Sequence, residues 1–314
     1  MTSPPPAPAV TVIGDALIDE LRSSSGTNSF VGGAALNVAV GLSVLGVSAT
    51  LVAMVGDDAD GDTIRAYLAS FGVNLVDSPA PHGTSRAVSD RTEGEPAYAF
   101  NLAAQRRTID FTSRTLEPIS TAELVVVSCY PFDSDEQSSA LASAVHDPAN
   151  RLIIDPNPRS GMLADRRRFV RNFEALATDA LLIKIGDDDA RLLYNSSLAS
   201  LTERLHDTSS ATILATAGRD GASIVDHRGR TARSPIADLP GAIVDTMGGG
   251  DATLASMTAS LLEALHAAAP PAAPPASAAP PASPPTPAWQ PALDRAMLIA
   301  AATCRHPGAL LRLP

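Results

Sequence analysis

The chain has 314 residues, 45% of them hydrophobic and 18% charged, and its formal net charge is −11. This balance is typical of a soluble globular protein and argues against a nucleic-acid surface, which needs clustered Lys and Arg. The two cysteines are too far apart in sequence to suggest a disulfide framework, and no apolar run reaches the roughly 20 residues that span a bilayer. The Pro-rich start lacks the features of a signal peptide. We therefore expect a cytoplasmic protein, with residues 1–314 forming one domain.

The first predicted element is a buried parallel strand over residues 9–13, a short β-branched run that ends at Gly14. Asp15 and Asp19 follow this strand directly. Carboxylates just past the carboxyl end of a parallel strand lie where open α/β sheets bind ligands. From their position alone, Asp15 and Asp19 are equally well interpreted as ligand-binding residues or as solvated loop residues that cap a helix or turn.

A buried helix is predicted over residues 34–45, which are Ala-rich and apolar nearly all round, after the pair Gly32 and Gly33. Asn37 lies in the first turns of this helix, and a buried Asn needs a partner from the backbone or from a ligand hydroxyl. A strand at 50–55, a glycine turn and an amphipathic helix at 60–71 follow. This order of elements favours a βαβ layout.

Residues 84–107 interrupt that order with strand-like segments at 87–91 and 97–100 around a polar turn, which is typical of a hairpin. An isolated hairpin is marginally stable, so we expect it to pair with residues 16–31 as a small β-lid. An exposed lid sheet would also allow a homodimer. Arg106 and Arg107 follow the hairpin, either as a solvated pair or as ligands for a phosphate or carboxylate on the substrate.

The alternation of strands and helices then resumes, with a strand at 124–128, a helix at 135–145 and a strand at 151–154. A Pro-rich loop follows and carries Arg159, which is either a surface cation or a residue that holds an anion. The next strand, 180–185, has Lys184 near its end, and the run Asp187, Asp188 and Asp189 comes after it. These carboxylates either hold a hydrated Mg²⁺ or favour the positive end of the following helix.

A last strand at 211–216 ends at Thr216 and leads into a loop with Gly218 and Gly221, and a hairpin follows it. The residues Gly248, Gly249 and Gly250 then precede a helix-prone run. Three glycines leave the backbone N–H groups uncovered by side chains. The first N–H groups of a helix also lack partners within the helix, so this segment is a candidate anion site. Asp251 at this point is either a helix cap or a base that accepts a proton from an attacking hydroxyl.

Composition changes sharply near residue 267, because ten of the 26 prolines lie between Pro270 and Pro291. Such a segment cannot build a packed element, so we predict a disordered Pro/Ala-rich insertion over about 267–291. A helix at 293–303 then continues the same domain.

The known catalytic motifs are absent: no histidine pair has metal-ligand spacing, and neither a nucleophile elbow nor a P-loop occurs. The glycine turns also fail the dinucleotide pattern. What remains is a set of strand-end loops that bring carboxylates, hydroxyl-binding groups and anion holes to one edge of a parallel sheet. This combination suits phosphoryl transfer to an alcohol.

Two stretches carry a resemblance to the ribokinase-like (PfkB) family of carbohydrate kinases. Residues 245–251, Asp-Thr-Met-Gly-Gly-Gly-Asp, resemble its C-terminal signature, and residues 32–37, Gly-Gly-Ala-Ala-Leu-Asn, with Gly46 and Gly56, resemble its N-terminal one. The resemblance implies a three-layer αβα fold with a mostly parallel central sheet and a small β-sheet lid. It also implies ATP-dependent phosphorylation of a sugar.

The resemblance further implies a role for each matching residue. Asp251 would be the general base, and the N–H groups of Gly248, Gly249 and Gly250 would form the anion hole. Residues implied in sugar binding are Asp15, Asp19, Gly33, Asn37, Arg159 and Asp251. Residues implied along the nucleotide are Lys184, Asp189, Thr216, Gly218, Gly221, Gly248 and Gly250. Asp189 would contact Mg²⁺ through water, and Asp245 would mark a site for a monovalent cation such as K⁺.

Among subgroups, the segments 14–19, 97–100, 155–159 and 184–187 look most like those of fructokinases, so fructose is the leading substrate. The chain departs from the family at Thr253, Ser256 and Asp189, where the family often has an aromatic residue, a small residue and Glu. Alternative acceptors are a 2-keto-3-deoxy sugar acid, a phosphosugar or a nucleoside. A protein that senses sugar or nucleotide without turnover is the alternative outside enzymes.

Overall fold

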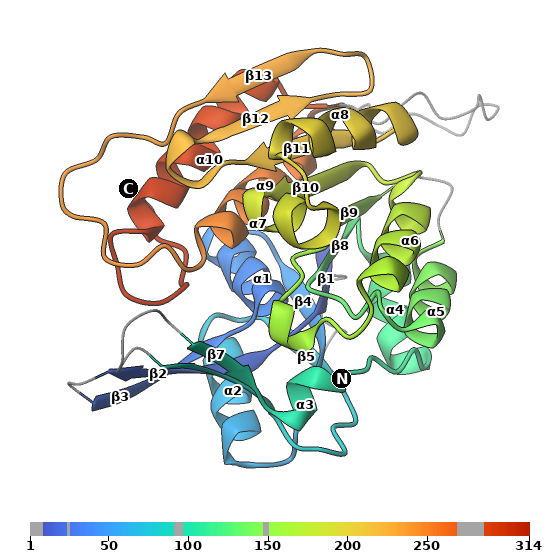
Figure 1. Cartoon of the computed structure of the whole chain (residues 1–314), viewed down its shortest axis with the longest axis vertical. Helices are drawn as coiled ribbons and strands as arrows, with labels where there is room; N and C mark the ends of the chain where they lie inside the picture. The colour runs from blue at the N-terminus through green and yellow to red at the C-terminus, as the bar shows by residue number, and fades with distance from the viewer. Residues whose placement is uncertain (1–8, 24–25, 91–96, 147–150, 269–285) are drawn as a thin grey trace, which may run out of the picture.

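The computed structural model describes residues 9–23, 26–90, 97–146, 151–268 and 286–314 (Figure 1). Within these residues one large sheet has the strand order β13-β12-β11-β10-β9-β8-β1-β4-β5. Its strands are β1 (Val10–Gly14), β4 (Ala49–Met54), β5 (Asn74–Ser78), β8 (Leu124–Ser128), β9 (Leu152–Asp155), β10 (Leu182–Gly186), β11 (Thr212–Thr216), β12 (Ala222–Val225) and β13 (Thr231–Ser234). Neighbouring strands are parallel except at β12, which runs antiparallel to β11 and β13. The predicted mostly parallel sheet is confirmed.

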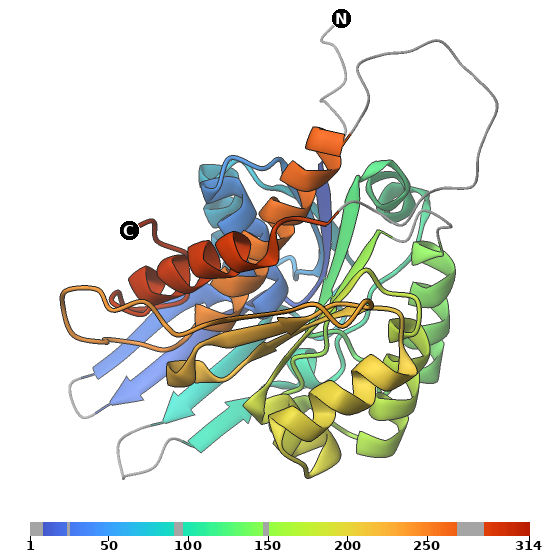
Figure 2. The same ribbon diagram turned by 90° about the horizontal axis from the view of Figure 1, so that it is seen from above.

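Helices cover both faces of this sheet (Figure 1, Figure 2). One layer holds α1 (Ala34–Val44), α2 (Ala59–Ser70), α9 (Gly249–Ala268) and α10 (Trp289–Thr303). The other holds α4 (Ser113–Thr121), α5 (Asp135–Val145), α6 (Arg166–Ala177) and α8 (Leu198–Thr208). Shorter pieces are α3 (Leu102–Gln105), η1 (Ser160–Met162), α7 (Asp187–Asp189), η2 (Ala190–Tyr194) and η3 (Gly218–Asp220). The three-layer αβα prediction is therefore confirmed.

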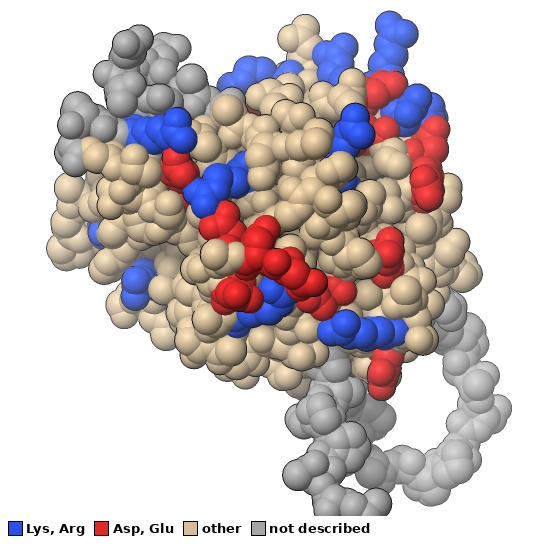
Figure 3. Space-filling model, turned by 90° about the horizontal axis from the view of Figure 1, so that it is seen from below, with Lys and Arg blue, Asp and Glu red and all other residues tan. Residues whose placement is uncertain are grey.

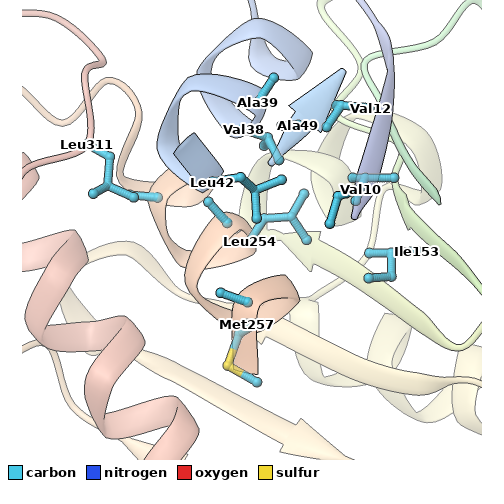
Figure 4. Close-up of a cluster of buried hydrophobic side chains, with 14 of the residues drawn as sticks. Val10, Val12, Val38, Ala39, Leu42, Ala49, Ile153, Leu254, Met257 and Leu311 are labelled. Carbon is cyan, nitrogen blue, oxygen red and sulfur yellow. The ribbon is translucent and has the colours of Figure 1, made fainter. Parts of the chain in front are cut away.

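Two apolar cores lie on opposite faces of the sheet because side chains alternate along each strand. In β1, Val10 and Val12 belong to the core under α1 and α9, while Ile13 belongs to the core under α5 and α6. Figure 4 shows the first core, where Leu42 of α1 and Leu254 of α9 lie close to the valines of β1. This packing fixes the amino end of α9 relative to the ends of the strands.

A second, smaller sheet has the order β3-β2-β6-β7 and lies below the main sheet in Figure 1. It consists of β2 (Leu17–Ser23), β3 (Gly26–Gly32), β6 (Ser85–Asp90) and β7 (Ala97–Phe100), so the two predicted excursions do form one lid. Arg86 of the lid lies 2.6 Å from Glu20 on β2 and 2.6 Å from Asp60 on α2. The first ion pair lies within the lid, and the second ties the lid to the main body. The predicted turn at 91–96 lies outside the described residues.

The ordered helices extend into both ends of the predicted insertion. α9 continues to Ala268, and α10 begins at Trp289 rather than at 293. Trp289 is buried and donates its indole N–H to Asp226 at 3.1 Å, which fixes the start of this helix. Residues 269–285 lie outside the described parts of the chain.

The surface agrees with the acidic composition. Figure 3 shows acidic and basic side chains interspersed on one face, with a group of acidic side chains near its centre. Across the described ranges, no helix combines the length and apolarity that crossing a bilayer requires.

Candidate active site

The predicted site residues meet where the carboxyl ends of β1, β9 and β10 face the amino end of α9. α9 begins at Gly249, directly after Gly248, whose φ of +76° favours glycine. A Cβ on Gly248 would lie 2.5 Å from the carbonyl oxygen of Ala309, so no larger residue fits without a shift. Gly248 therefore packs against the C-terminal loop, and the helix start that follows it is the kind of position that favours an anion.

Asp251 lies in the first turn of α9 with a side chain that is almost fully buried. Asn37 of α1 donates its amide N–H to Asp251 Oδ2 at 2.8 Å. Burial raises the pKa of Asp251 to about 6, although the Asn37 hydrogen bond and the charge of Lys184 oppose the shift. Asp251 is thus a carboxylate whose pKa is closer to neutrality than usual, which suits a general base.

Lys184 forms a buried ion pair beneath this helix start. Its Nζ lies 3.2 Å from each carboxylate oxygen of Asp155 and 3.2 Å from the position that a Cβ on Gly250 would take. Burial acts to lower the Lys184 pKa, but the carboxylates of Asp155 and Asp189 outweigh it, so the pKa is raised. The ammonium group therefore keeps its positive charge beside the glycines, where a phosphoryl group needs it.

Only one carboxylate of the run at 187–189 faces the interior. Asp189 is buried, and its Oδ2 accepts a hydrogen bond from the Gly186 N–H at 2.7 Å. Burial raises its pKa to about 6. Asp187 and Asp188 are exposed, and Asp188 pairs with Arg191. Asp189 thus caps its turn and lies within the charge network of Lys184, while its contact with Mg²⁺ stays a prediction.

The donor set permits Mg²⁺ only in a hydrated form. In the described parts of the chain, no group of three or more His, Cys, Asp or Glu side chains is arranged to hold a metal ion. Mg²⁺ usually keeps several waters and uses one or two carboxylates together with substrate phosphates. Asp189, beside Lys184 and the glycines, fits that pattern.

Two further carboxylates lie near Asp251, one at the end of β1 and one on the lid. Asp15 Oδ1 accepts a hydrogen bond from the Ala35 N–H at 3.0 Å, and burial raises the pKa of Asp15. Asp19, on the lid, has a pKa raised to about 7 by burial and by the charge of Asp15. A Cβ on Gly32 would lie 2.2 Å from Asp19 Oδ2, so the first glycine of the pair makes room for this carboxylate.

Gly33, which precedes α1, packs closely against the backbone of Asp15. Gly33 has a φ of +109°, and a Cβ there would lie 2.8 Å from the carbonyl oxygen of Asp15. The glycine lets the lid return to α1 directly above the end of β1. That return brings Asn37 to Asp251.

Two arginines lie close enough to influence these carboxylates. Arg159 is exposed to solvent, yet its charge opposes the rise in the pKa values of Asp15, Asp19 and Asp251. Arg107 is half-buried and donates to the carbonyl oxygens of Cys129 at 3.3 Å and Ala104 at 3.1 Å. Its charge also opposes the rise in the pKa of Asp15.

Arg106 and Arg107 differ in their exposure to solvent. Arg106 is exposed, as expected for a surface residue, whereas Arg107 lines a cavity of about 10 Å³ together with Asp15 and Ser85. That volume has room for about one water molecule. Sequence reasoning assigned no definite place to Arg107, and only its position after the lid hairpin pointed to it.

The nucleotide-side residues lie farther along the same edge of the sheet. Thr216 Oγ1 donates to the Ile185 carbonyl at 3.2 Å, which joins the ends of β10 and β11. Gly218 has a φ of +52° and nothing within 4 Å of a Cβ placed there, so it borders open space. Gly221 instead packs on the Ser234 carbonyl, where a Cβ would approach to 2.1 Å. Nucleotide contact remains a prediction for all three residues.

Asp245 ties two loops together. Its Oδ1 accepts from the Met247 N–H at 3.0 Å, and its Oδ2 accepts from the Gly308 N–H at 3.3 Å. The monovalent-cation site near it stays a prediction. Of the two unusual helix residues, Thr253 donates to the Gly249 carbonyl at 2.8 Å, while the buried Ser256 hydroxyl has no partner among the described residues.

An open hollow of about 590 Å³ lies elsewhere, against α6, where Arg166, Arg167 and Glu174 line it. It shares no residue with the cluster around Asp251. The chemistry described above therefore has a single location in the described structure.

Comparison with known proteins agrees with this geometry. Residues 9–311 match the model of the pfkB family carbohydrate kinases, and the chain belongs to that family. It is 28% identical over 264 residues to a fructokinase of Klebsiella pneumoniae, covering 80% of this chain and 84% of that protein. The protein is thus a sugar kinase, a phosphotransferase that acts on an alcohol group.

Solved structures share the fold. An uncharacterized sugar kinase from Pyrococcus horikoshii in complex with ATP has a TM-score of 0.74 at 18% identity, over 96% of this chain and 93% of that one. A Vibrio cholerae fructokinase with bound fructose, ADP and potassium ion has a TM-score of 0.72 at 18% identity, over 97% and 94%. At these identities the likeness defines the ribokinase-like fold.

Proposed function

We propose that this sugar kinase transfers the γ-phosphoryl group of ATP to a sugar hydroxyl and that fructose is its leading acceptor. The observation that carries the proposal is the arrangement of Asp251, Asn37 and Lys184 around the glycine start of α9. One buried carboxylate, one amide that orients it and one ammonium group meet at an anion-binding helix end. These are the parts that phosphoryl transfer to an alcohol requires.

In this mechanism, Asp251 accepts the proton of the attacking hydroxyl, and the Asn37 amide keeps the carboxylate in place. The N–H groups of Gly249 and Gly250 and the ammonium of Lys184 stabilise the charge on the transferred phosphoryl group. Bound Mg²⁺, held by water, phosphate oxygens and Asp189, would neutralise phosphate charge. Asp19 lies on the lid, so lid closure would bring it onto the sugar and exclude water.

The balance of charge favours a neutral acceptor. The charges of Asp15 and Asp251 both act to raise the pKa of Asp19, and the charge of Arg159 only partly opposes them. An acceptor carrying its own carboxylate or phosphate would add negative charge to this set. Hydroxyl groups of a neutral sugar can instead donate hydrogen bonds to the carboxylates. The Klebsiella pneumoniae relative is a fructokinase, which also supports fructose.

The test is an acceptor panel in a coupled assay that follows ADP release from Mg²⁺-ATP. Fructose, a 2-keto-3-deoxy sugar acid, fructose 6-phosphate and adenosine represent the four acceptor classes. We expect the highest kcat/KM with fructose. A higher value with an anionic acceptor would refute the charge argument, and sugar binding without turnover would indicate a sensing protein. The Asp251→Asn variant, prepared in parallel, controls for contaminating kinases.

Two further expectations belong to this proposal. We propose a monovalent cation at Asp245, tested by comparing activity in potassium with activity in tetramethylammonium. We also propose that the lid sheet pairs two copies in a homodimer, tested by light scattering in solution. A cation-independent rate contradicts the first expectation, and a monomer at all concentrations contradicts the second.

A further inference from the structure

The C-terminal loop at residues 307–309 lies between the lid and the glycine start of α9. On one side, the Gly308 N–H donates to Asp245 Oδ2 at 3.3 Å, and the carbonyl oxygen of Ala309 lies 2.5 Å from where a Cβ on Gly248 would be. Asp245 Oδ1 also accepts from the Met247 N–H at 3.0 Å. One carboxylate therefore fixes this loop to the residues that precede the anion hole.

On the other side, the lid reaches the same loop through an aromatic ring. Phe30 is on β3, and its Cδ1 lies 3.4 Å from the position that a Cβ on Gly308 would take. The φ of Gly308 is +77°, so the backbone favours glycine there, and a Cβ would meet the ring at ordinary van der Waals distance. Phe30 is half-buried, and its aromatic ring forms an apolar contact between the lid and the C-terminal loop of the main body.

Phe30 also lies directly opposite Asp19, the lid residue that we propose to contact the acceptor. It is the register partner of Asp19 in the antiparallel pair of β2 and β3. Side chains directly opposite each other point to the same face of a sheet. A lid position that brings Asp19 to the sugar therefore also brings Phe30 to Gly308.

We propose that Phe30 is a positioning residue that couples lid closure over the acceptor to the geometry of the anion hole, acting through Gly308 and Asp245. The inference rests on the proposed function, because it assumes that the lid closes on an acceptor. When the lid is closed, the ring of Phe30 limits the movement of Gly308. Gly308 holds Asp245 through its N–H, and Asp245 in turn holds the loop that leads to Gly248. Displacements of about 1 Å in such a site lower rates by as much as 10²-fold.

The proposal predicts a specific split in the kinetic constants. Phe30→Ala removes the ring from Gly308 but leaves Asp19, Asn37 and Asp251 in place. We expect kcat to fall at least tenfold, while the KM of the acceptor changes less than threefold. Phe30→Leu, which keeps an apolar side chain over Gly308, should recover most of kcat. A purely structural role in the lid would instead raise the acceptor KM at constant kcat.

The matched control is Leu21→Ala, which removes apolar volume from the same lid sheet two residues beyond Asp19 on β2. It should leave kcat within about twofold of wild type. A double-mutant cycle between Phe30→Ala and Asp245→Asn tests the path, because residues that act through one another give non-additive losses in kcat. Circular dichroism and a thermal melt confirm that each variant is folded.

The outcomes separate the two ideas. If the wild-type protein phosphorylates no acceptor, the proposed function fails before Phe30 is tested. If the wild type is active, the coupling is refuted when Phe30→Ala changes only the acceptor KM, when Leu21→Ala lowers kcat equally, or when the double-mutant cycle is additive. A tenfold loss of kcat with a non-additive cycle supports it.

Discussion

Replacing Asp251 by Asn tests the role of the buried carboxylate with almost no change in shape. The variant removes the proton acceptor but keeps a planar polar group of the same size. Asn37 can keep a hydrogen bond to it because an amide can present either its oxygen or its nitrogen. We therefore expect the acceptor to bind with close to wild-type affinity while turnover is lost.

The expected loss of activity follows from the contribution of a positioned base, about 10²- to 10⁴-fold in rate. The same substitution should stabilise the fold at alkaline pH. Burial raises the Asp251 pKa from 3.8 to about 6, so the folded chain holds this proton more tightly than the unfolded chain. That contribution to stability is complete below pH 3.8 and is lost as the pH rises through about 6. About two pKa units correspond to about 3 kcal/mol at pH 8, an unfavourable term that Asn does not carry.

The assay combines coupled ADP release for kcat, titration calorimetry for acceptor affinity, and urea unfolding at pH 8 and pH 4.5. The gain in unfolding free energy should be largest at pH 8 and much smaller at pH 4.5, where folded wild-type Asp251 is protonated. More than a tenth of wild-type activity in the variant would refute the assignment of Asp251 as the base. Equal gains at both pH values would refute the burial-driven pKa.

Three other predictions follow from the same contacts. Wild-type kcat should fall about tenfold for each pH unit below about 6, because only ionised Asp251 accepts a proton, and a pH–rate profile measures this. Lys184→Met leaves Asp155 buried without its cation, so the unfolding free energy in urea should fall by about 3–5 kcal/mol and the KM for ATP should rise. An unchanged urea midpoint would contradict the ion pair. Gly248→Ala forces a Cβ toward the Ala309 carbonyl at a φ of +76°, and kcat should fall at least tenfold in a protein whose circular dichroism is normal.

The residues at the carboxyl edge of the main sheet could be predicted because the sequence patterns that mark them are local. A β-branched run followed by glycine and a carboxylate indicates a strand end, and this pattern located Asp15 correctly at the end of β1. The glycine stretch before a helix-prone run likewise located Asp251 in the first turn of α9. The hairpin over 87–100 could not be stable alone, and this argument led to its partner in the lid.

Contacts between distant segments were not predictable from one sequence. Asp155 pairs with Lys184 across 29 positions, and nothing near either residue signals the other. α10 starts early because Trp289 bonds to Asp226, 63 positions away. α4 was missed because Pro118 lies inside it, although Thr112 and Thr115 form a capping box at its start. For the ion pair and the start of α10, tertiary contacts decide what the local pattern leaves open.

The long hairpin of α9 and α10 has a practical consequence. α9 has 20 residues, which at about 1.5 Å per residue separates Gly249 from Ala268 by roughly 30 Å. Ala268 is the end of α9 farthest from the glycines. A fluorophore, affinity handle or surface tether attached at Ala268 would therefore be well removed from the glycine start of the helix. This position suits biosensor construction or enzyme immobilisation.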